Sequence, residues 1–142
     1  MSARTLATNP FWSYCVMEEI GAGPHYFIDV PDSALALAIS SDRRVLLVTQ
    51  RRPALEKVTL EFPGGSLHPG ENAIEGAERE LAEETGLVPG APPYPIATLA
   101  PSTGCSSERC HVIVVPDVDD ASTRAESGLE LQWTRHQDVL GL

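Results

Sequence analysis

The segment from residue 65 to residue 87 constrains the fold most, because it predicts an amphipathic helix that carries clustered carboxylates. Apolar residues recur at helical spacing, at Ile74, Ala77 and Leu81. Residues three and four apart share a helix face, so Glu80, Glu83 and Glu84 are expected to project together. Because like charges at this spacing repel, the cluster suggests a bound cation, and carboxylate oxygens suit Mg²⁺ or Mn²⁺. The alternative is a solvated acidic helix face.

The predicted helix has signals at both of its ends. Asn72 is followed three residues later by Glu75, which is the spacing of a capping box. Gly86 suits the left-handed residue at a helix end. The sequence therefore predicts a helix from about residue 73 to residue 85.

The rest of the chain reads mainly as strands. Residues 11–30 predict a hairpin with a glycine-rich turn at residues 21–24, and the polar residues 1–10 are expected to lack regular structure. Further strands are expected at residues 33–40, 45–48, 58–62, 96–99, 110–115 and 129–133, followed by a short helix at residues 135–140. The first two of these are expected to pair as a hairpin, and residues 63–65 to stop the third. Strands around one strong helix support an α+β or α/β fold.

Length and charge limit the classes of function. The 142 residues suit a single domain over residues 1–142, and the net charge of −10 argues against a nucleic-acid-binding surface. No apolar run approaches membrane-spanning length, and no signal peptide is seen near the N-terminus. Three cysteines without a CxxC pair favour free thiols. We therefore expect a soluble, cytoplasmic protein without a membrane partner.

The helical segment also carries a family motif. Residues 65–87 match GX5EX7REUXEEXGU at every fixed position, with Gly65, Glu71, Arg79, Glu80, Leu81, Glu83, Glu84, Gly86 and Leu87. This resembles the Nudix box. The resemblance implies the Nudix fold, a mixed β-sheet sandwiched between helices, with the box forming a loop-helix-loop.

The Nudix resemblance also implies a metal site. By position, Glu80 and Glu84 would be the main metal ligands, Glu83 would assist, and the Gly64 carbonyl would be a further ligand. Arg79 would orient these carboxylates; the alternative is a surface arginine paired along the helix. The implied cofactor is Mg²⁺, with Mn²⁺ as the alternative.

Three further segments resemble the ADP-ribose and ADP-sugar pyrophosphatase branch of that family. Residues 48–53 resemble its Q-x-R segment, residues 60–65 its L-E-x-P-A-G segment and residues 101–108 its S-P-G-x-S-x-E loop. Pro101 also lies about fifteen residues past the box, as in that branch. The branch is expected to cleave the pyrophosphate of a nucleoside diphosphate derivative, with ADP-ribose as the leading substrate.

The same resemblance implies the substrate contacts. Arg52, or as second choice Arg51, would bind phosphates or the terminal ribose; the alternative is a solvated hairpin end. Glu61 would contact the ligand, and Glu108 would bind ribose hydroxyls unless it is a loop carboxylate without a role. Trp12 would stack on the base, with core packing as the alternative.

The catalytic base and the assembly are also inferred from the branch. The base is expected in a loop before the last strand, at Glu126, with Glu130 as second choice. Residues 1–30 form a shorter N-terminal extension than the branch usually has, and we associate it with a homodimer. Alternative functions are hydrolysis of another nucleotide sugar, a dinucleotide cofactor or a nucleoside triphosphate, and ligand sensing without turnover.

Overall fold

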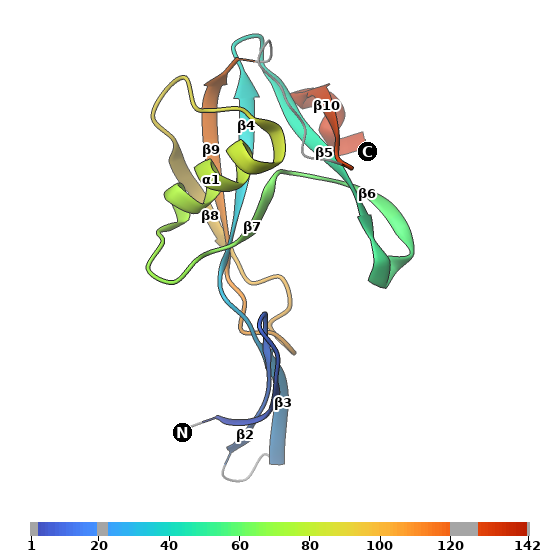
Figure 1. Cartoon of the computed structure of the whole chain (residues 1–142), viewed down its shortest axis with the longest axis vertical. Coiled ribbons are helices and arrows are strands. Elements are labelled where there is room, and N and C mark those ends of the chain that lie inside the picture. Colours follow the sequence, from blue (N-terminus) through green and yellow to red (C-terminus); the bar gives the residue numbers. More distant parts are fainter. Residues whose placement is uncertain (1–2, 20–22, 120–127, 142) are drawn as a thin grey trace.

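The computed structural model describes residues 3–19, 23–119 and 128–141, whose strands form two sheets (Figure 1). The strands are β1 (Arg4–Thr8), β2 (Ser13–Glu19), β3 (Gly23–Asp29), β4 (Ser33–Ser40), β5 (Arg44–Arg52), β6 (Lys57–Glu61), β7 (Gly64–Ser66), β8 (Tyr94–Leu99), β9 (Cys110–Val118) and β10 (Glu130–Arg135). The helices are α1 (Ala73–Thr85) and the 3₁₀-helices η1 (Pro53–Leu55) and η3 (His136–Gly141).

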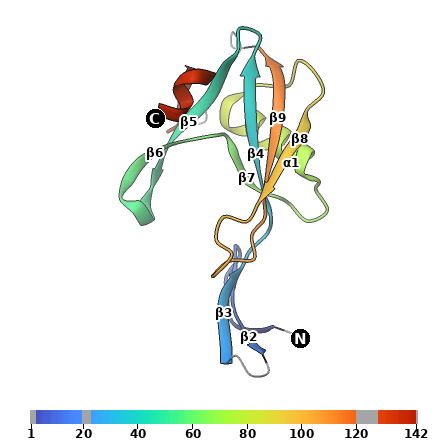
Figure 2. The same cartoon turned by 180° about the vertical axis from the view of Figure 1, so that it is seen from behind.

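The larger sheet has seven strands and is mixed. Five strands follow the order β10-β5-β4-β9-β8, while β6 pairs with β5 and β7 pairs with β4. Strand β4 runs parallel to β9 and antiparallel to β5 and β7. In the described ranges α1 is the one α-helix, and it lies on one face of this sheet, as Figures 1 and 2 show from opposite sides. The predicted α+β fold with a mixed sheet is confirmed.

Two expectations about strand pairing were incomplete. Strands β4 and β5 pair with each other as predicted, but among the described residues the pairing consists of Ile39 opposite Val45. Strand β4 pairs along its length with β9 instead. The glycine-rich residues expected to stop strand β6 also form β7, which pairs with β4. Both pairings join segments far apart in the sequence, so the local pattern of side chains does not reveal them.

The hydrophobic core lies between α1 and the larger sheet. Alternate residues of β4 are buried there, and three of them are alanines, Ala34, Ala36 and Ala38. Helix α1 contributes Ala77 and Leu81 to the same cluster. Small side chains on the sheet let the helix lie close to it. This packing brings one face of α1 against β7.

The N-terminal strands form a separate sheet in the order β1-β2-β3, at the end of the molecule away from α1 (Figure 1). The predicted hairpin is confirmed by the antiparallel pairing of β2 with β3. The expectation that residues 1–10 lack regular structure was wrong, since β1 pairs with β2. All five β1 residues are exposed, so backbone hydrogen bonds rather than a buried side-chain pattern hold this strand.

No helix in the described part of the chain is long and apolar enough to cross a membrane. The three cysteines, all within the described ranges, are free thiols as expected. Cys15 and Cys110 are buried, whereas Cys105 is exposed.

Candidate active site

Helix α1 begins and ends as its sequence predicts. The Asn72 side chain accepts hydrogen bonds from the backbone N–H groups of Ile74 and Glu75, at 3.0 and 3.1 Å. The Glu75 carboxylate accepts from the Asn72 N–H at 3.0 Å, which completes the capping box. At the other end, Gly86 has a φ of 74°, a left-handed conformation that glycine adopts without strain. These caps set which face of the helix carries each glutamate.

Two of the predicted metal ligands lie against strand β7. The Glu84 carboxylate accepts a hydrogen bond from the Gly64 N–H at 3.3 Å, and Glu84 is only 7% exposed. Glu80 lies one helical turn earlier, beside Gly65. A Cβ atom added at Gly65 would lie 2.5 Å from Glu80 Oε1, so a larger residue at this position would displace the carboxylate. The structure thus brings both glutamates to the same short strand.

Arg79 joins three glutamates and the backbone. Its guanidinium donates from Nε and Nη2 to the two oxygens of Glu71, at 2.8 and 3.0 Å, and from Nη2 to the Ser66 carbonyl at 3.0 Å. The Nη1 group donates to Glu80 at 2.7 Å and to Glu83 at 3.1 Å. These contacts support the predicted orienting role, because one rigid fork holds the Glu80 carboxylate relative to β7 and the loop before the helix.

The electrostatics of this cluster centre on Glu71. Hydrogen bonds from Arg79, and then one from the His68 N–H at 2.8 Å, lower the pKa of Glu71 to about 2. The hydrogen bonds that Arg79 donates, first to Glu71 and then to Glu80 and Glu83, raise the pKa of Arg79. Glu71 is therefore charged at neutral pH, and it ties the loop at residues 67–72 to the helix.

Glu83 is more exposed than Glu80 and Glu84. Its side chain is 58% exposed, against 15% for Glu80, and its contact in the cluster is with Arg79. The expectation that Glu80, Glu83 and Glu84 form one cluster therefore holds only in part, because Arg79 joins Glu80 to Glu83, whereas the Glu84 carboxylate accepts from the Gly64 N–H. Glu83 stays a predicted assisting residue, placed at the solvent side of the site.

Gln50 is a residue of the site to which sequence analysis assigned no role. Its side-chain amide donates to Glu84 Oε1 at 3.0 Å. Residues two apart on a strand face the same side, so Gln50 and Arg52 of β5 point in one direction. The Q-x-R resemblance of residues 48–53 was the available signal, but the partner, Glu84, lies 34 residues further along the chain.

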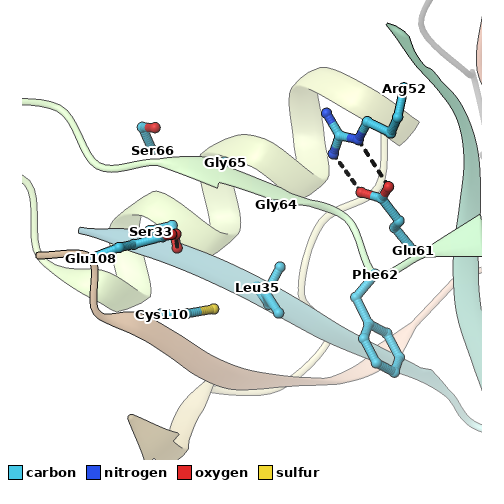
Figure 3. Close-up of a pocket in the computed structure, with 10 residues that line it drawn as sticks. All are labelled: Ser33, Leu35, Arg52, Glu61, Phe62, Gly64, Gly65, Ser66, Glu108 and Cys110. Carbon is cyan, nitrogen blue, oxygen red and sulfur yellow. Dashed lines mark hydrogen bonds and ion pairs between the residues drawn. The ribbon is translucent and has the colours of Figure 1, made fainter. Parts of the chain in front are cut away.

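A cavity of about 440 Å³ lies beside β7 (Figure 3). Gly64 and Gly65 form part of its wall, and they also lie against Glu84 and Glu80 respectively. The remaining lining residues are Ser33, Leu35, Arg52, Glu61, Phe62, Ser66, Glu108 and Cys110. Three of the predicted substrate contacts, Arg52, Glu61 and Glu108, thus line one cavity.

The polar residues of the cavity are held in pairs. Arg52 donates from Nε to Glu61 Oε1 at 2.9 Å and from Nη2 to Glu61 Oε2, as Figure 3 shows. This pair raises the pKa of Arg52 and lowers that of Glu61. The Ser33 hydroxyl donates to Glu108 at 2.7 Å. The cavity therefore presents one guanidinium and two carboxylates to a ligand.

The other predicted site residues lie elsewhere. Arg51 is exposed on β5 and is not among the residues lining the cavity. Trp12 is 42% exposed and lines a different depression, of about 410 Å³, beside the N-terminal sheet. The alternative of core packing for Trp12 is therefore wrong in this chain. Glu126, the predicted base, lies outside the described residues, and Glu130 is exposed on β10.

The donor atoms at β7 fit a hard divalent cation. Among the described residues, no three Asp, Glu, His or Cys side chains converge as a metal-binding group. The predicted donor set of Glu80, Glu84 and the Gly64 carbonyl combines two carboxylates with a backbone oxygen, which are the ligand types that Mg²⁺ and Mn²⁺ prefer. The contacts of Glu84 with Gly64 and of Glu80 with Gly65 place the two carboxylates at neighbouring residues of β7.

Comparison with known proteins identifies the family. The sequence model of the NUDIX domain matches residues 30–141, which include β4 to β10 and the whole of the site described above. The chain belongs to the NUDIX domain family. The N-terminal sheet precedes the matched residues.

Individual relatives agree with this assignment. The NUDIX chain is 36% identical over 84 residues to "Methanol dehydrogenase activator" of Bacillus methanolicus, covering 59% of this chain and 45% of that protein. It is 30% identical over 96 residues to "ADP-ribose pyrophosphatase" of Bacillus subtilis (strain 168), covering 68% of this chain and 51% of that protein. The chain thus spans about half the length of these relatives.

A solved structure shows the same fold. The "Crystal structure of ADP compounds hydrolase" superimposes on this NUDIX chain with a TM-score of 0.76 and 20% sequence identity. The match covers 100% of this chain and 82% of that chain. It therefore includes the N-terminal sheet as well as the NUDIX residues.

Proposed function

We propose that this protein is a Mg²⁺-dependent hydrolase of the pyrophosphate bond in nucleoside diphosphate derivatives. ADP-ribose is the leading substrate, and AMP and ribose 5-phosphate would be the products. One observation carries the proposal: Gly64 and Gly65 of β7 line a polar cavity and also lie against the carboxylates of Glu84 and Glu80. This arrangement lets a phosphate chain in the cavity approach the carboxylates at the wall formed by Gly64 and Gly65.

The proposed roles follow from the contacts. Glu80, Glu84 and the Gly64 carbonyl would hold Mg²⁺, with Mn²⁺ as the alternative and Glu83 assisting. When bound, such an ion neutralises phosphate charge and lowers the pKa of a coordinated water. Arg79 keeps Glu80 oriented through the hydrogen bond that its Nη1 group donates to Glu80 Oε1. The proposed general base is Glu126, which precedes β10 in the sequence, with Glu130 as second choice.

The cavity suits a diphosphate that carries a hydroxyl-rich group. Its volume of about 440 Å³ lies within the usual range for small-ligand pockets. Arg52 supplies the fork geometry that binds phosphate oxygens. Glu61 and Glu108 are acceptors for hydroxyl groups, and they add negative charge that opposes a third phosphate. These features favour ADP-ribose over a nucleoside triphosphate. We propose that Trp12 stacks on the base of the substrate only in an assembly, in which the N-terminal sheet of one chain lies beside the cavity of another.

Phosphate release from a substrate panel, coupled to a phosphatase that hydrolyses the monoester products, tests the proposed function. ADP-ribose, other nucleotide sugars, dinucleotides and nucleoside triphosphates would be incubated with Mg²⁺ and compared by kcat/KM. Preference for ADP-ribose supports the proposal. Preference for another compound keeps the hydrolase chemistry and removes the roles given to Glu61 and Glu108. Binding without turnover of any compound would favour a nucleotide sensor instead.

Replacing Arg52 by alanine is expected to raise the KM for ADP-ribose about 10- to 100-fold, because a charge-assisted hydrogen bond to phosphate contributes about 1.5–3 kcal/mol. The matched variant is Arg51→Ala. Adjacent strand residues face opposite sides, so Arg51→Ala should change KM by less than about threefold. Steady-state kinetics at saturating Mg²⁺ measure both. An equal effect of the two variants would contradict the assignment of phosphate binding to Arg52.

We further propose a homodimer formed through the N-terminal sheet. This sheet adds no residue to the main core cluster and exposes several large apolar side chains, Leu6, Phe11, Trp12, Tyr14 and Tyr26. Tyr14 and Tyr26 stack with ring centroids 5.9 Å apart and extend this apolar surface. Apolar patches of this kind mark association surfaces in soluble proteins.

Light scattering after size exclusion should give twice the 15.3 kDa mass of one chain. The double substitution Phe11→Ser and Tyr26→Ser is expected to return the single-chain mass, because it removes apolar area from the exposed surface. Circular dichroism would check that the double variant stays folded. A single-chain mass for the unmodified protein at every concentration tested would exclude this dimer.

A further inference from the structure

Gln50 contacts the site at the carboxylate that the proposed function relies on most. Its amide Nε2 lies 3.0 Å from Glu84 Oε1, while the Gly64 N–H lies 3.3 Å from Glu84 Oε2. One oxygen of Glu84 is thus held by a side chain of β5 and the other by the backbone of β7. These two donors approach Glu84 from different strands and limit rotation of the carboxylate plane.

We propose that Gln50 is a positioning residue that orients Glu84 for binding a divalent cation. This inference rests on the proposed function, because it assumes that Glu84 is a metal ligand. A carboxylate oxygen has two lone-pair directions, so Oε1 can accept from Gln50 and still bind a cation. Outer hydrogen bonds of this type fix the orientation of metal ligands and raise their affinity.

The burial of Glu84 explains why this carboxylate needs a dedicated donor. It is only 7% exposed, so water reaches it poorly, and a buried carboxylate requires hydrogen bonds to offset its lost hydration. The amide donor is uncharged. It therefore orients Glu84 without cancelling the negative charge that attracts a cation, whereas Glu80 is held by the charged Arg79.

The strand geometry gives Gln50 a second consequence. Gln50 and Arg52 share one face of β5, and Arg52 contacts Glu61 in the cavity wall. The same short segment thus contacts the Glu84 carboxylate through Gln50 and lines the cavity through Arg52. Because Gln50 and Arg52 belong to one strand, β5 holds the proposed metal ligand Glu84 and the phosphate-binding Arg52 in a constant relative position.

The experiment measures Mn²⁺ binding directly, by calorimetry and by the electron paramagnetic resonance signal of free Mn²⁺, without substrate. Gln50→Met keeps a side chain of similar length and removes the donor. It is expected to weaken Mn²⁺ binding about 10- to 100-fold. The matched control is Gln132→Met on the neighbouring strand β10, because the Gln132 amide donates to the Thr134 hydroxyl and not to a carboxylate. Gln132→Met should bind Mn²⁺ within about twofold of the unmodified protein.

A kinetic readout separates positioning from a general structural defect. Raising the Mg²⁺ concentration should restore most of the kcat of Gln50→Met, with the KM for ADP-ribose changed by less than about threefold. A merely structural role would give a loss that added metal does not repair. Thermal unfolding checks the fold. Gln50→Ala is the second variant, and it must show the same loss of affinity.

The outcomes are distinguishable. Unchanged Mn²⁺ affinity in either Gln50 variant, or an equal loss in Gln132→Met, would overturn the positioning role. If Glu84→Gln binds Mn²⁺ as the unmodified protein does, the metal platform of the proposed function fails as well. If Glu84→Gln loses affinity and the Gln50 variants do not, only the positioning role fails.

Discussion

Glu84→Gln is expected to lower kcat/KM for ADP-ribose by roughly a thousandfold or more, because a metal ligand contributes several kcal/mol to stabilising the reacting phosphates. The fold should survive, since glutamine has the same shape. The amide oxygen of the introduced glutamine can still accept from the Gln50 amide, which in the unmodified protein donates to Glu84 Oε1.

Phosphatase-coupled phosphate release and Mn²⁺ binding would measure this effect, and circular dichroism would confirm folding. The matched control is Glu78→Gln, on the same helix but roughly 200° around its axis from Glu80, at 3.6 residues per turn. Glu78→Gln should retain activity within about threefold. Full activity of Glu84→Gln would remove the metal assignment at this position.

Arg79→Ala is expected to have the second large effect, on both stability and turnover. The substitution leaves the carboxylates of Glu71 and Glu80 without their cationic partner, although these side chains are only 13% and 15% exposed. Removing one partner of a largely buried pair costs on the order of 2–4 kcal/mol of unfolding free energy. We also expect kcat to fall about 100-fold, because Glu80 loses its orientation.

The stability loss in Arg79→Ala should depend on pH. Hydrogen bonds from Arg79, and then from the His68 N–H, lower the folded-state pKa of Glu71 from 4.5 to about 2, so the interaction with Arg79 stabilises the folded chain fully above pH 4.5. It is lost as pH falls toward 2, where Glu71 becomes protonated. The difference in unfolding free energy between the unmodified protein and Arg79→Ala should therefore shrink between pH 4.5 and 2.

Denaturant unfolding across that pH range provides the measurement. Arg135→Ala is the control, because Arg135 and Asp138 form an exposed pair with side chains 70% and 46% exposed. Such a pair contributes at most about 1 kcal/mol. A pH-independent difference for Arg79→Ala would show that Glu71 is not the main source of its stabilising effect.

Local signals predicted the parts of the fold that depend on neighbouring residues. The Asn72 and Glu75 capping box, the apolar stripe and the Gly86 helix end all act within a few residues, and all appear in the structure as expected. The β2–β3 hairpin was predictable for the same reason. Strand β1 was missed because its side chains are exposed and its stability comes from pairing with β2.

The candidate site was predictable only in part. The box spacing placed Glu80 and Glu84 on one helix, and the similar motifs pointed to Arg52, Glu61 and Glu108, which share a cavity. Trp12 shares no depression with them in a single chain, and Gln50 received no role. Both differences arise from how separate segments pack, which a motif does not encode.

Residue spacing and local hydrogen bonds are enough to specify the family motif, the helix that carries it and the ends of that helix. The placement of Gly64 and Gly65 against two glutamates and in a cavity wall, and the contact of Gln50 with Glu84, arise only when the chain packs. The parallel pairing of β4 with β9, which brings Ser33 beside Cys110, was decided at the same level. These contacts join segments dozens of residues apart, so they follow from the packing of the whole core and not from any local pattern.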